Sequence, residues 1–133
     1  MYTHKIKLRV RYGETDQMKY VYYGVYAQYF EVGRVELLRS LGLSYKQLEE
    51  IGYSLPVVNY NIDYKKPAFY DDELTIETTI FQIPTVKIVF SYKTYNSYGD
   101  ILNTAETTLV FVDMKTGKPC QSPKILIEKL QNI

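Results

Sequence analysis

The sequence predicts an α+β protein in which one antiparallel sheet wraps around a single long helix. Three observations carry this prediction. Only one stretch of the 133 residues, from about residue 23 to residue 41, shows a sustained helical repeat of apolar side chains. The stretches after residue 54 alternate or stay apolar over strand lengths and are separated by turn residues. The connections between those stretches are short, which favours antiparallel pairing and a sheet with one face packed on the helix.

The first two elements follow from their repeats. Near the N-terminus, Ile6, Leu8 and Val10 alternate with basic residues, which is the period of two of a half-buried strand. The long helix is predicted to start near Tyr23 and to stop at Leu41-Gly42, where glycine suits the left-handed conformation that closes many helices. Its apolar side comprises Tyr22, Tyr26, Tyr29 or Phe30, Gly33, Leu37 and Leu41, and its other positions include Gln28, Glu31, Glu36 and Arg39.

The remaining elements are a short helix, four strands and a final short helix. The first of these helices spans Ser44 to Gly52, with Ser44 as its cap. The strands are predicted over residues 55–64, 74–80, 86–94 and 101–112. Ser122 is then predicted as a cap and Pro123 as the first residue of a helix that runs through Leu130. Because no repeat, low-complexity tract or linker is evident, residues 1–133 are predicted to form one domain, with a core supplied by an apolar content of 46%.

Composition argues against several classes of function. Lysine and arginine number 16 against 15 acidic residues and form no block of like charge, so a nucleic-acid surface is not expected. No segment reaches the roughly 18 apolar residues of a membrane span, and the expected location is cytoplasmic. Cys120 is the only cysteine and His4 the only histidine, so no metal site is predicted, and a Ser-His or Cys-His catalytic pair would depend on His4. If the protein is an enzyme, a carboxylate is the expected leading group.

The most informative position is Asp16, in the tight connector between the first strand and the long helix. The free N–H groups at a helix start attract anions, so a carboxylate and an oxyanion site would lie side by side here. An aspartate in such a place is more often a turn or capping residue, and the spacing alone favours that ordinary role. Six tyrosines fall between Tyr12 and Tyr29. Core and interface packing accounts for most of them, although a tyrosine-lined cleft near Asp16 stays open.

Several short motifs of the sequence match those of a known family. They are Arg11-Tyr12 leading into Glu14-Thr15-Asp16, Val21-Tyr22-Tyr23 with Tyr26, Tyr29-Phe30-Glu31 with Arg34, and Ile62-Asp63-Tyr64-Lys65-Lys66-Pro67-Ala68 with Asp72-Glu73-Leu74. Together with the order of the elements, they make almost the whole chain resemble the hotdog-fold acyl-CoA thioesterases, in the branch that contains 4-hydroxybenzoyl-CoA thioesterase and the Tol-Pal-associated thioesterases. The resemblance implies a hotdog fold, in which a five-stranded antiparallel sheet wraps around one long central helix.

The resemblance also implies roles for individual residues. It implies that Asp16 is the catalytic carboxylate, as nucleophile or as base for a water, which reverses the preference for an ordinary turn residue. It implies that backbone N–H groups around Tyr23 and Gly24 polarise the thioester carbonyl. Two positions depart from the family pattern. Lys19 stands where the family commonly has glycine, and at a positive φ a lysine costs on the order of 1 kcal/mol. Val25 stands where the family often has a polar residue, and we attribute both departures to tolerated drift.

The substrate implied by the resemblance is an acyl-CoA or an acyl group on a carrier protein. Coenzyme A would then be part of the substrate, and no separate cofactor is predicted. Its phosphates require exposed basic residues near the cleft mouth, for which Lys65 and Lys66 are the best candidates, although a solvated strand end explains them equally well. Dehydration of a hydroxyacyl thioester is a second possibility, but it relies on a histidine with a carboxylate and His4 is badly placed. A non-catalytic acyl-thioester binding or scaffold protein is the third.

The predicted sheet also bears on assembly. A single sheet leaves one face and its edge strands unprotected, and tyrosines are common anchors at interfaces, so a homodimer or homotetramer is predicted. The resemblance implies that the sheets of two subunits join edge to edge and that the active sites lie between them.

Overall fold

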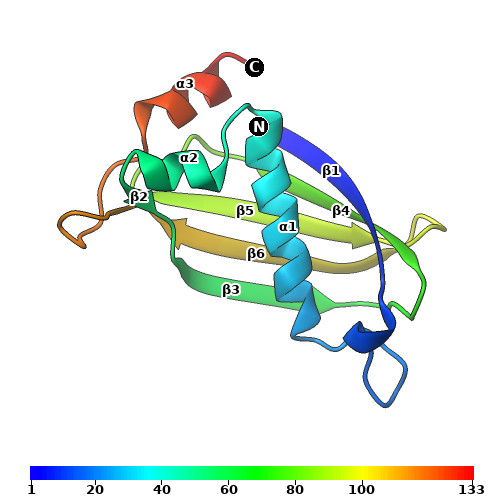
Figure 1. The fold of residues 1–133 in the computed structure, drawn as a ribbon. Helices are drawn as coiled ribbons and strands as arrows, with labels where there is room; N and C mark the ends of the chain where they lie inside the picture. Colours follow the sequence, from blue (N-terminus) through cyan, green and yellow to red (C-terminus); the bar gives the residue numbers. More distant parts are fainter.

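The computed structural model describes residues 1–133, and its centre is a five-stranded antiparallel sheet with the strand order β1-β4-β5-β6-β3. The strands are β1 (Tyr2–Arg9), β3 (Val57–Tyr64), β4 (Glu73–Ile80), β5 (Lys87–Tyr95) and β6 (Ile101–Val110). Figure 1 shows the long helix α1 (Val25–Ser40) crossing one face of this sheet. The predicted fold class, with five antiparallel strands around one long helix, is therefore confirmed.

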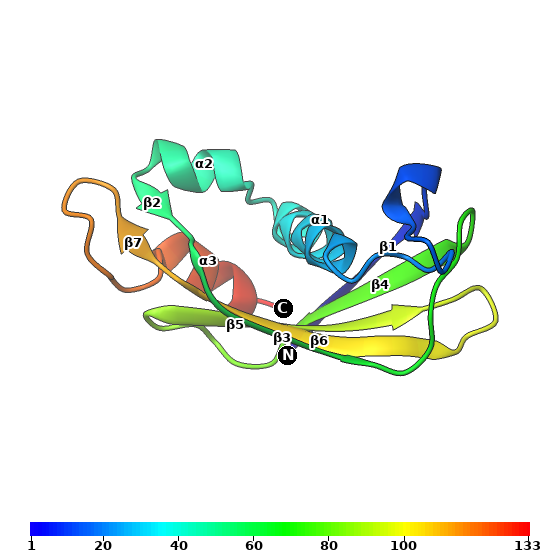
Figure 2. The same cartoon turned by 90° about the horizontal axis from the view of Figure 1, so that it is seen from below.

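Alternation along the strands decides which face of the sheet α1 covers. On β4 and β5, side chains such as Leu74, Ile76, Ile88 and Phe90 are buried while their neighbours are more exposed. They form one core cluster with the buried aromatic and leucine side chains of α1. Figure 2 shows that the sheet curves around α1 and that all three helices lie on the same side of it.

Helix and sheet approach each other closely at Gly33 in the middle of α1. A Cβ at this position would lie 2.6 Å from the Oγ1 of Thr78 and 3.2 Å from a methyl carbon of Ile76. Glycine therefore allows α1 to lie closer to β4 than a side chain would. The helix ends where the sequence predicts, because Ser40 is its last residue and Gly42 has a positive φ of 81°.

The connection from β3 to β4 differs from the short hairpin-like links predicted for the strands. β3 is an edge strand beside β6, whereas β4 lies beside β1 near the other edge, so residues 65–72 cross from one side of the sheet to the other. The N-terminal strand is the reason. β1 pairs with β4 from Tyr2↔Ile80 to Arg9↔Glu73, which leaves β3 the free side of β6. All the pairs are nonetheless antiparallel, as predicted.

Smaller elements flank the sheet. The 3₁₀ turn η1 (Tyr12–Glu14) follows β1, and at the other end of the sheet lie α2 (Tyr45–Glu50), α3 (Lys124–Gln131) and a two-stranded ribbon of β2 (Tyr53–Ser54) and β7 (Val112–Asp113). The predicted strand over residues 101–112 is thus divided between β6 and β7. None of the helices has the length and apolar character of a membrane span.

The starts of the two short helices give different outcomes. Ser44 caps α2 as predicted, because its hydroxyl accepts the N–H of Gln47. At α3 the prediction is wrong by one residue. Pro123 is the cap rather than the first helical residue, since its ψ of 139° is extended and its carbonyl accepts the N–H groups of Leu126 and Ile127.

Candidate active site

Asp16 lies in a short hairpin that connects η1 to α1. Thr15 and Val21 form the bridge of this hairpin, and the N–H of Asp16 donates to the carbonyl of Tyr20 at 2.8 Å. The Oδ1 of Asp16 accepts the N–H of Met18 at 2.9 Å and that of Tyr20 at 3.2 Å. Its Oδ2 accepts no hydrogen bond from the chain. Asp16 thus has the turn role that spacing alone favours, and it retains one carboxylate oxygen for other work.

Lys19 completes the turn in a left-handed conformation. Its φ is 67°, and its N–H donates to the carbonyl of Asp16 at 2.9 Å. A non-glycine residue in this region costs on the order of 1 kcal/mol. Lys19 therefore has the positive φ at which a lysine is unfavourable, and the hairpin carries local strain beside Asp16.

The start of α1 has no side-chain cap. Gly24 is the N-cap, and no side chain accepts a hydrogen bond from the first turn of the helix. The N–H of Tyr22 donates to Glu14 and that of Val25 donates to Tyr22, but the N–H groups of Tyr23 and Gly24 between them have no acceptor in the chain. A helix start with free donors carries a partial positive charge. An oxyanion would be stabilised at this point.

A cleft of about 300 Å³ brings these features together. Asp16 and Tyr23 line it, and so do Lys65 and Lys66 from the end of β3; Gly24 adjoins Tyr23 without lining the cleft itself. The rest of its wall is mainly aromatic and apolar, made by Met18, Tyr20, Val21, Tyr26, Tyr64 and Pro67. The tyrosine-lined cleft that the sequence left open is therefore present.

Two of the wall tyrosines are held in place by the fold. Tyr26 is buried, and its burial raises the pKa of its hydroxyl to about 12. Tyr64 donates its hydroxyl to the carbonyl of Tyr23 at 3.4 Å, and partial burial raises its pKa as well. Both hydroxyls are therefore neutral near pH 7, and neither supplies a base that would compete with Asp16.

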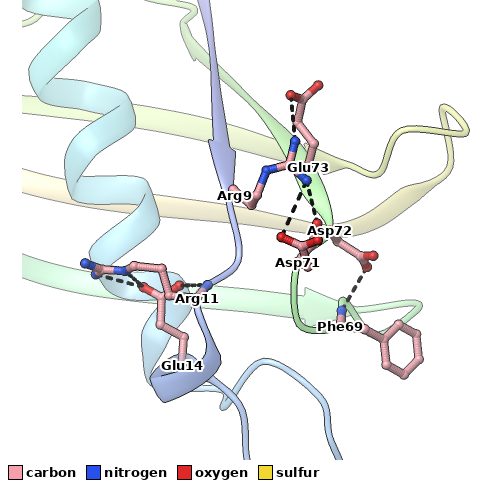
Figure 3. A network of polar contacts seen from close by, with 7 residues as sticks. All are labelled: Arg9, Arg11, Glu14, Phe69, Asp71, Asp72 and Glu73. Carbon is pink, nitrogen blue, oxygen red and sulfur yellow. Dashed lines mark hydrogen bonds and ion pairs between the residues drawn. The ribbon is translucent and has the colours of Figure 1, made fainter.

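The crossing connection between β3 and β4 supports the hairpin from one side. The N–H of Val21 donates to the carbonyl of Ala68 at 2.9 Å, and the rings of Tyr20 and Phe69 meet edge to face at 5.5 Å. The connection is itself tied down, because Arg9 donates to the carbonyl of Asp71 and Asp72 accepts the N–H of Phe69, as Figure 3 shows. The unexpected topology of β3 and β4 thus supplies one wall of the cleft.

Glu14 supports the hairpin from the other side, and sequence reasoning assigned it no role. Its carboxylate accepts the backbone N–H of Arg11 at 2.8 Å and the Arg11 guanidinium at 3.1 Å (Figure 3). It also accepts the Tyr29 hydroxyl at 2.8 Å. Burial opposes its charged form, but these hydrogen bonds outweigh burial and hold the pKa of Glu14 below its usual value. An acidic residue three positions after Arg11, at the start of a tight turn, was the signal available in the sequence.

The two lysines at the cleft differ in their surroundings. Both backbone N–H groups donate to the carbonyl of Leu102, which fixes this end of β3 against β6. The ammonium group of Lys66 lies 3.5 Å from a carboxylate oxygen of Asp100, whereas Lys65 makes no ion pair. Lys65 is therefore the more available of the two for a ligand's anionic group.

The remaining titratable residues add little to this site. His4 lies at the opposite end of β1 from the hairpin, opposite Thr78 of β4, and its Nδ1 is buried without a partner. This position is unsuited to a pair with Asp16. No group of three or more His, Cys, Asp or Glu side chains comes together as metal ligands would.

Known proteins match this chain in both sequence and fold. Residues 10–130 match the family described as the thioesterase-like superfamily. The chain is 39% identical to "Putative acyl-CoA thioesterase YneP" of Bacillus subtilis, over 93% of this chain and 90% of that protein. It is 32% identical to acyl-CoA thioester hydrolase YbgC of Escherichia coli, over 93% of this chain and 92% of that protein. The structure of DHNA-CoA thioesterase from Staphylococcus aureus superposes with a TM-score of 0.91 at 30% identity, covering 99% of this chain and 93% of that one.

Proposed function

The chain belongs to the thioesterase-like superfamily, among its acyl-CoA thioester hydrolases, and on that premise we propose that Asp16 and the start of α1 together cleave the thioester bond of an acyl-CoA. One observation carries the proposal. Asp16 lines a cleft with one carboxylate oxygen that accepts no hydrogen bond, and the same cleft is lined by Tyr23, whose N–H, like that of the adjoining Gly24, has no acceptor. A free carboxylate and oriented donors are the groups that thioester hydrolysis needs.

The proposed chemistry begins at the free oxygen of Asp16. A water molecule gives a proton to this oxygen while its own oxygen bonds to the thioester carbon. The carbonyl oxygen takes the negative charge and receives hydrogen bonds from the N–H groups of Tyr23 and Gly24. The C–S bond then breaks, the sulfur takes the proton from Asp16, and the acid and free thiol leave.

A second route uses the same oxygen as a nucleophile. Asp16 attacks the thioester carbon, the thiolate leaves, and an anhydride forms that water then hydrolyses to the acid and the free carboxylate. Both routes require a charged Asp16 and the same two donors. They therefore predict the same result when the charge is removed.

Lys65 and Lys66 are proposed to meet the phosphates of coenzyme A at the mouth of the cleft. Both are exposed and line the cleft, and Lys65 has no ion pair to give up. An acyl group on a carrier protein would present a phosphate at a comparable place, so the proposed substrates are an acyl-CoA and an acyl-carrier protein.

We further propose that the protein is a homodimer or homotetramer. β3 is an unpaired edge, and its exposed side chains include Val57, Val58, Tyr60 and Tyr64. An apolar edge strand of this kind is ready to pair with another chain. Because Tyr64 also lines the cleft, a partner on this edge would adjoin the site. A light-scattering mass equal to one chain at micromolar concentration would contradict this proposal.

The test of the function is the release of free thiol from a panel of acyl-CoA esters by the wild type and by Asp16→Asn. Asparagine keeps an oxygen for the N–H of Met18 but cannot take a proton from water. We expect turnover to fall by about 10² to 10⁴ while the melting temperature changes little.

A matched control is Asp113→Asn, away from the cleft. Like Asp16, Asp113 accepts the N–H of the residue two positions later, that of Lys115, at 2.8 Å. Asp113→Asn therefore makes the same change to a turn, but outside the cleft. Its activity should equal that of the wild type. If Asp16→Asn melts normally and keeps more than about a tenth of wild-type turnover, Asp16 is not the catalytic group. A wild type that binds acyl-CoA without releasing thiol would instead favour the non-catalytic binding or scaffold function.

A further inference from the structure

We propose that Glu14 is a positioning residue, which through Tyr29 holds the Asp16 hairpin in register with the start of α1. This proposal rests on the function assigned above to Asp16. Glu14 does not line the cleft, so its proposed role is indirect. Its task is to keep the carboxylate of Asp16 and the N–H groups of Tyr23 and Gly24 at a constant separation, because both must reach the same carbonyl group.

The backbone of Glu14 closes the hairpin. Its carbonyl accepts the N–H of Tyr22 at 2.9 Å, and the bridge between Thr15 and Val21 follows directly. Asp16 is two residues beyond Glu14 on one arm of the hairpin, and Tyr23 is one residue beyond Tyr22 on the other. A shift of Glu14 would therefore move both halves of the proposed site.

The side chain of Glu14 ties that hairpin to two rigid elements. It is only 9% exposed. Its Oε1 accepts the N–H of Arg11, just after β1, and the hydroxyl of Tyr29, one turn into α1. Its Oε2 accepts the guanidinium of Arg11 at 3.1 and 3.3 Å. Both oxygens are thus occupied, in contrast to Asp16, so Glu14 is committed to holding rather than to chemistry.

The bond to Tyr29 is the critical member of this set. It is the one side-chain hydrogen bond between α1 and residues 11–22, and both of its partners are buried. Hydrogen bonds to a charged acceptor in a buried site have well-defined geometry. The other hydrogen bond between the hairpin and α1 is the backbone bond from Val25 to Tyr22, which constrains the last residues of the hairpin but not Asp16.

The test is Tyr29→Phe, which removes one oxygen atom and keeps the ring in the core. We expect kcat to fall by about ten- to a hundredfold, because displacement of a reacting group by an ångström costs on this order, while KM changes little. The matched control is Tyr95→Phe. Tyr95 also donates to a glutamate, Glu77, at 3.1 Å, on the face of the sheet away from α1. Its kcat should stay within about twofold of wild type.

A second comparison separates positioning from general loosening of the fold. In an Asp16→Asn background, Tyr29→Phe should lower the residual rate no further, because residues that act as a unit are not additive. Glu14→Gln, which keeps the size but removes the charge, should behave like Tyr29→Phe. All rates are measured well below the melting temperature of each variant.

Two results would overturn the proposal. One is a folded Tyr29→Phe variant whose kcat lies within about twofold of wild type. The other is an equal loss from Tyr29→Phe with and without the Asp16 carboxylate, which would mark Glu14 as a structural anchor. If Tyr29→Phe does not fold, Glu14→Gln decides by the same criteria, and loss of folding in both would also refute a role limited to positioning. Failure of the function itself is distinguishable, because Asp16→Asn alone would then retain its activity.

Discussion

Helices α1 and α2 follow one another along the chain but begin in opposite ways. At α2 the hydroxyl of Ser44 accepts the N–H of Gln47, and the Gln47 side chain accepts the N–H of Ser44 at 2.8 Å, so two donors at this start are bound by side chains of the chain itself. At α1 the cap is Gly24, which has no side chain, and the donors of Tyr23 and Gly24 are free. The side-chain cap of α2 contributes stability, whereas the uncapped start of α1 adjoins the cleft and is available to a ligand.

The same contrast recurs in the two carboxylates of the hairpin. Glu14 accepts hydrogen bonds on both oxygens and is buried, whereas Asp16 keeps one oxygen free and lines the cleft. The unpaired oxygen of Asp16 and the unpaired donors at the start of α1 add no hydrogen bond to the fold, so they are available to a ligand, as the proposed function requires.

The comparison is tested most strongly by removing one free donor of α1. Gly24→Pro takes away the N–H, and the φ of −69° at this position suits proline. Relative to Gly24→Ala, which adds a similar Cβ but keeps the N–H, turnover should fall by about 10² to 10³. In both variants the Cβ would lie 3.0 Å from the exposed ring of Tyr22, so this contact is common to the two.

The measurement is kcat for thiol release by the two Gly24 variants, with thermal melting to verify that both fold. Equal turnover of Gly24→Pro and Gly24→Ala would mean that this N–H takes no part in the reaction. The oxyanion site would then have to be sought at Tyr23 alone.

At the capped start of α2 we expect a smaller effect, on stability and not on turnover. Ser44→Ala removes the hydroxyl that caps α2 and should lower the free energy of unfolding by about 1 kcal/mol. Turnover should not change, since Ser44 does not line the cleft. Chemical denaturation and thiol release, measured on the same sample, test both parts. Ser44→Asn, which restores a capping oxygen, should recover most of the stability, and a loss of activity in Ser44→Ala would contradict the division between the two helix starts.

The smallest effect is expected at the mouth of the cleft onto which α1 opens. Lys65→Ala should raise KM for an acyl-CoA by about two- to fivefold, because an exposed ion pair is worth less than about 1 kcal/mol. The increase should shrink as salt screens the phosphates. Lys66→Ala should change KM less, since Lys66 is already paired with Asp100. Lys87→Ala, on an exposed and remote position of β5, is the control, and an equal rise in KM there would remove the case for a phosphate site.

Local patterns in the sequence determined the elements of this protein. The period of two along the strands and the spacing of tyrosine and leucine along α1 predicted the sheet, the helix and the face that they share, because amphipathic repeats reflect which side chains are buried. Ser44 and Gly42 were also interpreted correctly from the sequence, since caps and left-handed helix ends depend on a few neighbouring residues. Asp16 was placed beside the start of the helix by its position in the chain alone.

The strand order and the partners of the two carboxylates depend on residues far apart in the sequence, and only the folded structure shows them. β3 and β4 are consecutive in the chain but are not neighbours in the sheet, because β4 pairs with β1, some seventy residues away. No local pattern in the sequence indicates such a pairing. The crossing segment that this creates carries Ala68 and Phe69 to the hairpin. The partnership of Glu14 with Tyr29 depends in the same way on how α1 is laid against the end of β1. Hydrogen bonding within the fold, and not residue type, therefore determined which of the two neighbouring carboxylates is engaged and which is free.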